Sequence, residues 1–158
     1  MLAYIMHIIY NELINNAIEQ LKMTIKSYHC TSNANLNAIK TGEGSYNGIF
    51  VSLANPCYDY GEHTYLVEFG SICSTSDIED YLDEHPDFLD AHPNFVADFD
   101  EAVEDDCYFE NQKLRAHIAV ELGFDAVEEN DGFLVVNGKV TYLGKSRSEE
   151  VEDFVNDN

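Results

Sequence analysis

The sequence predicts an α+β fold in which a small, split antiparallel sheet is flanked by helices. Short runs of β-forming residues alternate with stretches of helical periodicity along the 158 residues. No G-x-G-x-x-G follows a predicted strand and no P-loop motif is present, which disfavours a Rossmann-type sheet. Hydrophobic residues make up 45% of the chain, so one domain can bury a core.

Helical and strand patterns alternate through the first half of the chain. Residues 4–23 place apolar side chains at three- and four-residue spacing, which predicts an amphipathic helix. The further expected elements are a strand over 23–29, a short helix over 33–40, a strand over 48–52, a helical turn over 57–61 and a strand over 64–69.

Residues 76–110 form an acidic insert that we expect to be helical. Ser76 and Asp77 can cap a short helix over 78–82. His85-Pro86 is followed seven residues later by His92-Pro93, and Pro favours the first turn of a helix, so two more short helices are expected. Neither the histidines nor the cysteines have the spacing of zinc ligands, so no metal is expected.

The last third of the chain shows one clear helix. Leu114, Ile118 and Leu122 form an apolar stripe over residues 111–122, and Gly123 stands where a C-terminal cap belongs. Asn137-Gly138 between residues 133–136 and 139–143 predicts a β-hairpin. We therefore expect one domain over 1–145 that contains the insert 76–110. The acidic tail 146–158 is predicted to be frayed or loosely helical.

The charge of the chain is strongly negative and unevenly distributed. Eight Lys and Arg face 30 Asp and Glu, a formal net charge of −22. This balance disfavours nucleic acids and anionic membranes as direct partners and favours a basic protein. No Lys or Arg lies between Lys40 and Lys113. The insert is therefore either a solvated face or a docking surface for a basic partner.

The cysteines and the hydropathy pattern indicate a cytoplasmic protein. The four cysteines show no regular disulfide framework, which is typical of reduced thiols. The apolar start lacks the basic region of a signal peptide. No apolar run approaches the length of about 20 residues that spans a membrane.

Two groups of residues suggest chemistry. His29 ends a predicted strand, so its ring can face a cleft while Thr31 and the backbone of Cys30 offer hydrogen bonds. Such a set suits ribose hydroxyls and a carboxamide, although a structural histidine would give the same pattern. Asp131, with Glu128 and Glu129 nearby, could stabilise an oxocarbenium-like centre or could be ordinary turn acids.

The order of these motifs resembles the ADP-ribosyltransferase superfamily. Tyr28-His29-Cys30-Thr31-Ser32, the strand from Gly48 to Ser52, Tyr60-Gly61 and the strand over 64–69 look like the front half of such a domain. There an H-G-T/S tripeptide binds NAD. The segment from Leu114 to Asp131 is similar to small phage anti-CRISPR proteins of ADP-ribosyltransferase type. The resemblance covers roughly residues 27–143 and implies an ADP-ribosyltransferase-like fold.

The resemblance also implies roles for individual residues. His29 would hold the NAD ribose, the backbone of Cys30 would pair with the nicotinamide carboxamide, and Thr31 would support the same loop. Asp131 would act as the catalytic acid that stabilises the cationic C1′, with Glu128 as the second candidate. The other implied NAD-binding residues are Tyr28, Phe50, Ser52 and Tyr60. Cys30 stands where the family has Gly, so this backbone contact requires a negative φ.

The function that the resemblance implies is NAD-dependent mono-ADP-ribosylation of a host protein. The target would be a basic subunit of a bacterial CRISPR surveillance complex, reached in the bacterial cytoplasm if a phage encodes the chain. The alternative is a non-enzymatic acidic protein that mimics nucleic acid and blocks a basic groove, as the net charge favours. A third possibility is an acidic accessory domain without chemistry of its own.

Overall fold

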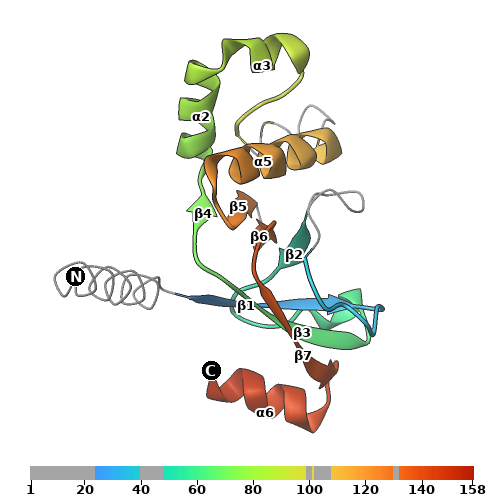
Figure 1. The fold of residues 1–158 in the computed structure, drawn as a ribbon. Helices are drawn as coiled ribbons and strands as arrows, with labels where there is room; N and C mark the ends of the chain where they lie inside the picture. The colour runs from blue at the N-terminus through green and yellow to red at the C-terminus, as the bar shows by residue number, and fades with distance from the viewer. Residues whose placement is uncertain (1–23, 40–47, 99–100, 102–107, 130–131) are drawn as a thin grey trace, which may run out of the picture.

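The described part of the chain folds into two β-sheets with helices at both ends (Figure 1). The structure is a computed structural model that describes residues 24–39, 48–98, 101, 108–129 and 132–158. The helix predicted over 4–23 lies outside these residues. The α+β class and the split sheet are confirmed.

Sheet A is antiparallel and three-stranded, with the order β1-β3-β7. Its strands are β1 (Ile25–Thr31), β3 (His63–Phe69) and β7 (Lys139–Lys145). The strands predicted over 23–29 and 64–69 are thus present, each shifted by a residue or two.

Sheet B is four-stranded, with the order β2-β6-β5-β4. Its strands are β2 (Ile49–Val51), β6 (Gly132–Val135), β5 (Ala126–Glu129) and β4 (Ile72–Cys73). The β4–β5 pair is parallel, so this sheet departs from the all-antiparallel expectation. The reason is that the helical segment between Cys73 and Ala126 forms a crossover from β4 to β5, and such a connection brings a strand back parallel.

The labelled helices lie at opposite ends of the molecule, with α6 (Glu149–Asp157) at one end and the other three at the other end (Figure 1). Near sheet B lie α2 (Thr75–Glu84), α3 (Pro86–Ala91) and α5 (Tyr108–Leu122), and η1 (Tyr58–Tyr60) precedes β3. One apolar cluster joins α2 and α5 to sheet B through residues such as Ile78, Ile118 and Leu134, none of which is exposed. A second cluster between the two sheets contains Val67 and Val135.

The caps of these helices follow the sequence signals in part. Ser74, rather than Ser76, caps α2 in a capping box with Asp77. Pro86 begins α3 as predicted. Gly123 follows α5 with φ of 79°, as expected for a C-terminal cap. Pro93 begins a turn and not a helix, so the prediction of a second helix that starts at a proline is wrong.

The hairpin predicted at Asn137-Gly138 is also wrong. β6 pairs with β2 and β5 in sheet B, whereas β7 pairs with β3 in sheet A. Asn137 is held by Asp125, whose backbone O accepts from the Asn137 N–H at 3.0 Å and whose Oδ1 accepts from its Nδ2 at 2.7 Å. These bonds direct the chain from one sheet to the other, so the Asn-Gly turn signal marks a crossover.

The helix predicted over 33–40 is absent from the described residues 33–39, which form turns. The Tyr65 hydroxyl donates to the Asn33 carbonyl at 2.8 Å and accepts from the Leu36 N–H at 3.3 Å. Asn33 Oδ1 also accepts from the Asn35 N–H at 2.9 Å. These bonds use backbone groups that a helix would need, so the segment lies as a loop on sheet A.

The acidic tail contains a regular helix, α6 (Glu149–Asp157). Val151 on this helix is fully buried, and α6 contacts β7. At its start, Arg147 stacks over the Tyr58 ring and pairs with Asp59. The tail is therefore docked on sheet A and not frayed.

Asp125 ties the two sheets together, and its removal should lower stability. Its Oδ2 accepts from the Gly70 N–H at 3.0 Å and the Ser71 N–H at 3.1 Å. We expect Asp125→Ala to lower the free energy of unfolding by about 2 to 3 kcal/mol, because these amides lose a charged acceptor. Asp59→Ala, which removes only an exposed ion pair, should cost about 0.5 kcal/mol or less.

Urea denaturation of both variants measures this difference. Burial acts to raise the pKa of Asp125, but hydrogen bonds from Asn137, Gly70 and Ser71 outweigh it and hold the pKa below its ordinary value. The stabilisation is therefore present above the unfolded-state pKa and is lost as the pH falls through the folded-state pKa. A gap between wild type and Asp125→Ala that stays constant into strong acid would contradict this assignment.

Candidate functional site

The two sheets meet where β1 and β2 share a single bridge. The Tyr28 N–H donates to the Ser52 carbonyl at 2.8 Å, and the Ser52 N–H donates to the Tyr28 carbonyl at 2.9 Å. In a continuous antiparallel ladder the next hydrogen-bonded pair would be Cys30 with Phe50. The Phe50 carbonyl instead accepts from His29 Nδ1 at 2.7 Å. We call this parting of the strands the fork; its residues are Tyr28, His29, Cys30, Phe50 and Ser52.

The contact with Phe50 fixes the chemistry of the His29 ring. A carbonyl only accepts, so Nδ1 must carry the proton in this bond. Burial lowers the pKa of His29, and the hydrogen bond to Phe50 opposes this shift without cancelling it. The ring is therefore neutral at pH 7, and Nε2 is a hydrogen-bond acceptor suited to a hydroxyl group.

The backbone N–H and C=O groups of Cys30 face the β2 edge of β1. Successive residues of an antiparallel strand turn their N–H and C=O groups to opposite edges. Tyr28 uses the β2 edge of β1, so Cys30, two residues on, turns its N–H and C=O to the same edge beyond the Ser52 bridge. Among the described non-glycine residues only Arg147 has a positive φ. Cys30 thus meets the backbone requirement that the resemblance imposes, and its buried thiol faces Thr64.

Thr31 and Tyr60 lie at the open end of β1. Thr31 Oγ1 accepts from the Asn33 N–H at 3.2 Å and so begins the loop that Tyr65 holds. Gly61 lies against the Thr31 backbone so closely that any side chain at Gly61 would overlap it. This packing brings Tyr60 next to Thr31, and the Tyr60 side chain is 77% exposed. The Ser52 hydroxyl is less available to a ligand, because it donates to the Asn55 carbonyl at 2.6 Å.

Of the two candidate catalytic acids, the structure describes only Glu128. Asp131 is outside the described residues. Gly132, the next residue, packs against the Val51 carbonyl, where a side chain would overlap. His29 and Gly132 thus flank β2 from opposite edges, which corresponds to about 10 Å at ordinary strand spacing. Glu128 is exposed on β5, the strand beyond β6. It therefore lies farther from His29 than Gly132 does.

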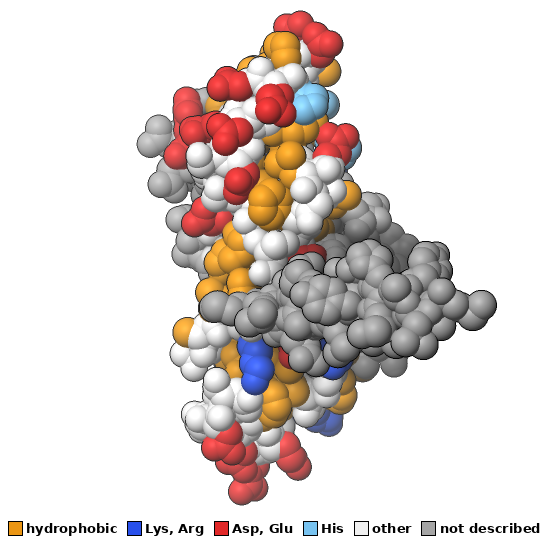
Figure 2. Space-filling view, turned by 60° about the vertical axis from the view of Figure 1, so that its left-hand side comes forward, with side chains coloured by type: hydrophobic (Ala, Val, Ile, Leu, Met, Phe, Trp, Pro, Cys, Tyr) orange, Lys and Arg blue, Asp and Glu red, His pale blue; other side chains and the backbone are white. Residues whose placement is uncertain are grey.

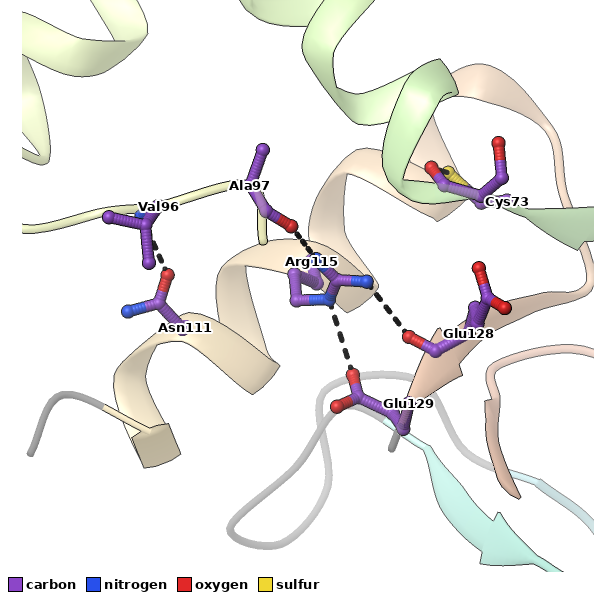
Figure 3. Close-up of polar contacts among 8 residues, drawn as sticks. Cys73, Val96, Ala97, Asn111, Arg115, Glu128 and Glu129 are labelled. Atoms are coloured by element: carbon purple, nitrogen blue, oxygen red, sulfur yellow. Dashed lines mark hydrogen bonds and ion pairs between the residues drawn. The ribbon is translucent and has the colours of Figure 1, made fainter. Parts of the chain in front are cut away.

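A buried polar cluster behind β5 was not predicted from the sequence (Figure 3). Arg115 on α5 is 1% exposed, and its Nε lies 3.5 Å from Glu129 Oε1. Gln112, one helical turn earlier, is also 1% exposed. Arg115 lies between Leu114 and Ala116 on a helix whose apolar side chains pack into the core. A charged residue among these apolar residues is the sequence feature that could have predicted the cluster.

A surface pocket lies away from the fork. It measures about 410 Å³ and lies at the opposite end of β1, lined by Thr24, Glu68, Phe69, Gly70, Asp125, Asn137, Gly138 and Lys139. Several of its polar groups are hydrogen-bonded to Asp125, where the chain passes from sheet B to sheet A. The convergent donors and acceptors at the fork therefore make it the better candidate site.

The described residues contain no group of three or more His, Cys, Asp or Glu arranged to hold a metal ion. None of the described helices has the length and hydropathy needed to cross a membrane.

Comparison with known proteins supports the fold. No protein-family model and no curated protein matches the chain. A solved structure described as "Crystal structure of an anti-CRISPR protein" matches with a TM-score of 0.57 and 19% sequence identity. The match covers 76% of this chain and 96% of that chain. The chain therefore shares the small α+β fold of an anti-CRISPR protein.

The buried carboxyl of Glu129 should make stability depend on pH near neutrality. Burial raises its pKa from 4.5 to about 7, against the attraction of Arg115. The folded state therefore binds a proton that the unfolded state releases, and stability declines as the pH rises through this window. Relative to wild type, Glu129→Gln should gain about 1.4 kcal/mol for each pH unit between these values.

Urea denaturation at half-unit steps from pH 5 to pH 8 tests this. Glu128→Gln is the matched control, since the neighbouring side chain is exposed. Its pH profile should run parallel to that of wild type. A parallel profile for Glu129→Gln as well would mean that Glu129 is ionised throughout.

Proposed function

We propose that the chain is an anti-CRISPR inhibitor that transfers ADP-ribose from NAD to a subunit of a bacterial CRISPR surveillance complex. The observation that carries the proposal is the fork, where a neutral His29 lies beside Cys30, whose backbone N–H and C=O face the β2 edge of β1. The structural neighbour supports the inhibitor part through its fold. The enzymatic part depends on the fork and on the order of the sequence motifs.

The fork offers the groups that NAD recognition needs. His29 Nε2 can accept a hydrogen bond from a ribose hydroxyl, since Nδ1 is engaged by Phe50. The Cys30 N–H and C=O together match a carboxamide, which carries one acceptor and one donor on the same edge. Tyr60 is exposed beside Thr31 and offers an aromatic face to a ring.

The chemical step needs an acid near the breaking bond. NAD supplies the ADP-ribosyl group and nicotinamide as the leaving group. The C1′–N bond breaks, nicotinamide departs with the electron pair, and the acceptor forms the new bond to C1′ and loses a proton. Asp131 is proposed to stabilise the positive charge at C1′, as carboxylates do in glycosidic cleavage. Gly132 connects Asp131 to the strand that borders β2.

The acidic helices are proposed to direct the chain to its target. Figure 2 shows acidic side chains gathered at the two ends of the visible face, over the α2–α3 region and over α6. The exposed acids of α2 and α3 include Glu79, Asp80, Asp83, Glu84, Asp87 and Asp90. A basic protein surface would be attracted to such a face, which raises the association rate most at low salt.

Labelling with biotin-NAD tests the enzymatic proposal. A purified CRISPR surveillance complex incubated with the wild-type chain should incorporate label, and mass spectrometry should find one added ADP-ribose. His29→Ala and Asp131→Asn should each lower the labelling rate by about a hundredfold or more, because they remove a substrate contact and a charge that stabilises the transition state.

Two variants serve as matched controls for this experiment. His117 lies on α5 outside the insert, and its Nε2 is 3.4 Å from Glu121 Oε1, so His117→Ala removes a histidine contact away from both the fork and the docking helices. Asp157→Asn removes an exposed acid of the tail. Both should label at the wild-type rate. Absence of label with wild type, while inhibition of the complex persists, would refute the transferase proposal.

A second candidate function is steric inhibition by mimicry of nucleic acid. The net charge of −22 and the exposed acids of α2 favour it. In that case inhibition needs no NAD, tolerates His29→Ala and Asp131→Asn, and weakens steeply with salt. Titration of the complex with and without NAD separates the two functions.

The acidic face of α2 should control association under either function. We expect the fourfold variant Glu79→Gln, Asp80→Asn, Asp83→Asn and Glu84→Gln to lower the association rate by about tenfold at low salt. The matched fourfold variant of α6 is Glu149→Gln, Glu150→Gln, Glu152→Gln and Asp153→Asn, which removes the same charge.

Surface plasmon resonance at several salt concentrations measures these rates. The α2 variant should approach wild type as salt screens the attraction, while the α6 variant should stay close to wild type throughout. Equal losses for both variants would mean that net charge alone, and not the insert, guides association.

A further inference from the structure

Sheet A carries a charge opposite to that of the chain as a whole. Its three strands contain a single acid, Glu68, and three lysines, Lys26, Lys139 and Lys145, which leaves a surplus of two positive charges. The whole chain has a formal net charge of −22. Figure 2 shows Lys and Arg side chains between the two acidic ends of the visible face. An anionic ligand therefore meets less repulsion at this sheet than at the acidic helices.

The register of the strands divides sheet A into a charged face and an acid-free face. Lys26, Glu68 and Lys139 lie opposite one another and share the charged face. The other face carries two cross-strand rows at the open end of β1, which are His29–Tyr65–Tyr142 and Thr31–His63–Lys145. On this face the three strands contain no Asp or Glu. The face that holds the fork histidine is therefore the one that an anion can approach.

Tyr142 presents an aromatic ring to solvent at the β7 edge of this face. It is 49% exposed, whereas Tyr65 opposite it is fully buried. The Tyr142 ring packs against the Tyr65 ring at 5.1 Å and the His63 ring at 5.8 Å between centroids. Its hydroxyl lies 3.0 Å from His63 Nδ1. A ring held in this way loses little conformational freedom when a flat ligand ring stacks on it.

Lys145 supplies a cation that no acidic side chain compensates. Lys26 bonds the Asn158 side chain at 2.8 Å, and Lys139 lies 3.7 Å from Glu68. Within the described part of the chain, the Lys145 ammonium has neither a hydrogen bond nor an ion pair. An exposed ammonium of this kind is a common contact for phosphate oxygens.

The row Thr31–His63–Lys145 connects the fork with these two side chains. The Tyr65 hydroxyl is bonded to the loop over residues 33–36, so this loop covers the inner row. None of the three residues of the outer row is buried. β1 and β7 flank β3 and are therefore about 10 Å apart at ordinary strand spacing. A diphosphate that joins two ribosyl groups can span this distance.

We propose that Tyr142 and Lys145, with His63 beside them, form a nucleotide subsite that holds the ADP half of NAD while the fork holds the nicotinamide half. The adenine ring stacks on Tyr142, and the diphosphate lies along His63 and Lys145. The assignment of NAD as the ligand rests on the proposed transferase function, whereas affinity for ADP itself does not. These residues bind and orient the ligand and take no part in bond breaking.

Titration of the full chain with ADP tests this subsite without any reaction. In isotope-labelled wild type, ADP should shift the amide resonances of His63, Tyr142 and Lys145, and calorimetry gives the affinity. Tyr142→Leu and Lys145→Met should each weaken ADP binding by about tenfold, because one removes the stacking surface and the other the cation. Tyr142→Phe keeps the ring and should stay within about twofold of wild type.

Two variants control for net charge and for exposed aromatic surface. Lys139→Met removes a cation of the same strand from the opposite face, and Phe109→Leu removes a 63% exposed ring on α5. Both should bind ADP like wild type. If Lys139→Met weakens binding as much as Lys145→Met, general attraction explains the affinity and the subsite is overturned. Because Lys145 is exposed, its variant keeps the test decisive if Tyr142→Leu fails to fold.

Inorganic pyrophosphate separates the contribution of the base from that of the phosphates. Wild type should bind ADP about tenfold more tightly than pyrophosphate, and Tyr142→Leu should lose this preference. Equal affinities in wild type would refute stacking on Tyr142. The whole subsite is refuted if wild type does not bind ADP at millimolar concentration.

Steady-state labelling with NAD connects the subsite to the proposed reaction. Tyr142→Leu and Lys145→Met should raise KM for NAD by about tenfold and leave kcat within about threefold, since they bind ground state and transition state alike. If wild type labels and both variants keep its KM, the subsite does not hold NAD and the transferase function stands. If wild type does not label but ADP binding depends on Tyr142 and Lys145, the transferase function fails and the nucleotide subsite stands.

Discussion

The architecture of the site depends on the single bridge between Tyr28 and Ser52. It joins sheet A to sheet B, and it ends where the His29 ring takes the Phe50 carbonyl in place of the Cys30 amide. If the ladder continued, the two sheets would merge and the backbone edge of Cys30 would be paired. Because the ladder stops, the strands part, and a hydrogen-bonding edge and a neutral histidine lie at the same point.

The charges on the surface and the charge in the interior have opposite signs and different surroundings. Most of the acids in the described part of the chain lie on exposed helical faces, where they stay hydrated. Arg115 is buried and compensates the Glu129 carboxyl from inside the fold. The surface charges are therefore the groups that we propose to act in encounter with a partner, whereas this buried cation contacts β5 inside the fold.

Prediction from the sequence succeeded where local patterns agreed with tertiary packing. The first strand was predicted over 23–29, two residues early, and α5 with its Gly123 cap and the helix at Pro86 were predicted correctly, since each needs only neighbouring residues. Prediction failed at Asn137-Gly138 and at residues 33–39. There, Asp125 and the Tyr65 hydroxyl, both distant in the sequence, bind the backbone and override the local turn and helix signals.

The sequence by itself determined the α+β class and the acidic character, and its motif order led to the residues that we propose bind NAD. These follow from periodicity, composition and motif order, which are local or additive properties. Only the tertiary structure decided that His29 is a neutral acceptor, that Cys30 turns its backbone to the β2 edge of β1 and that the Arg115 side chain contacts Glu129. Each of these depends on a partner far along the chain, and no sequence pattern specifies which carbonyl a buried donor will meet.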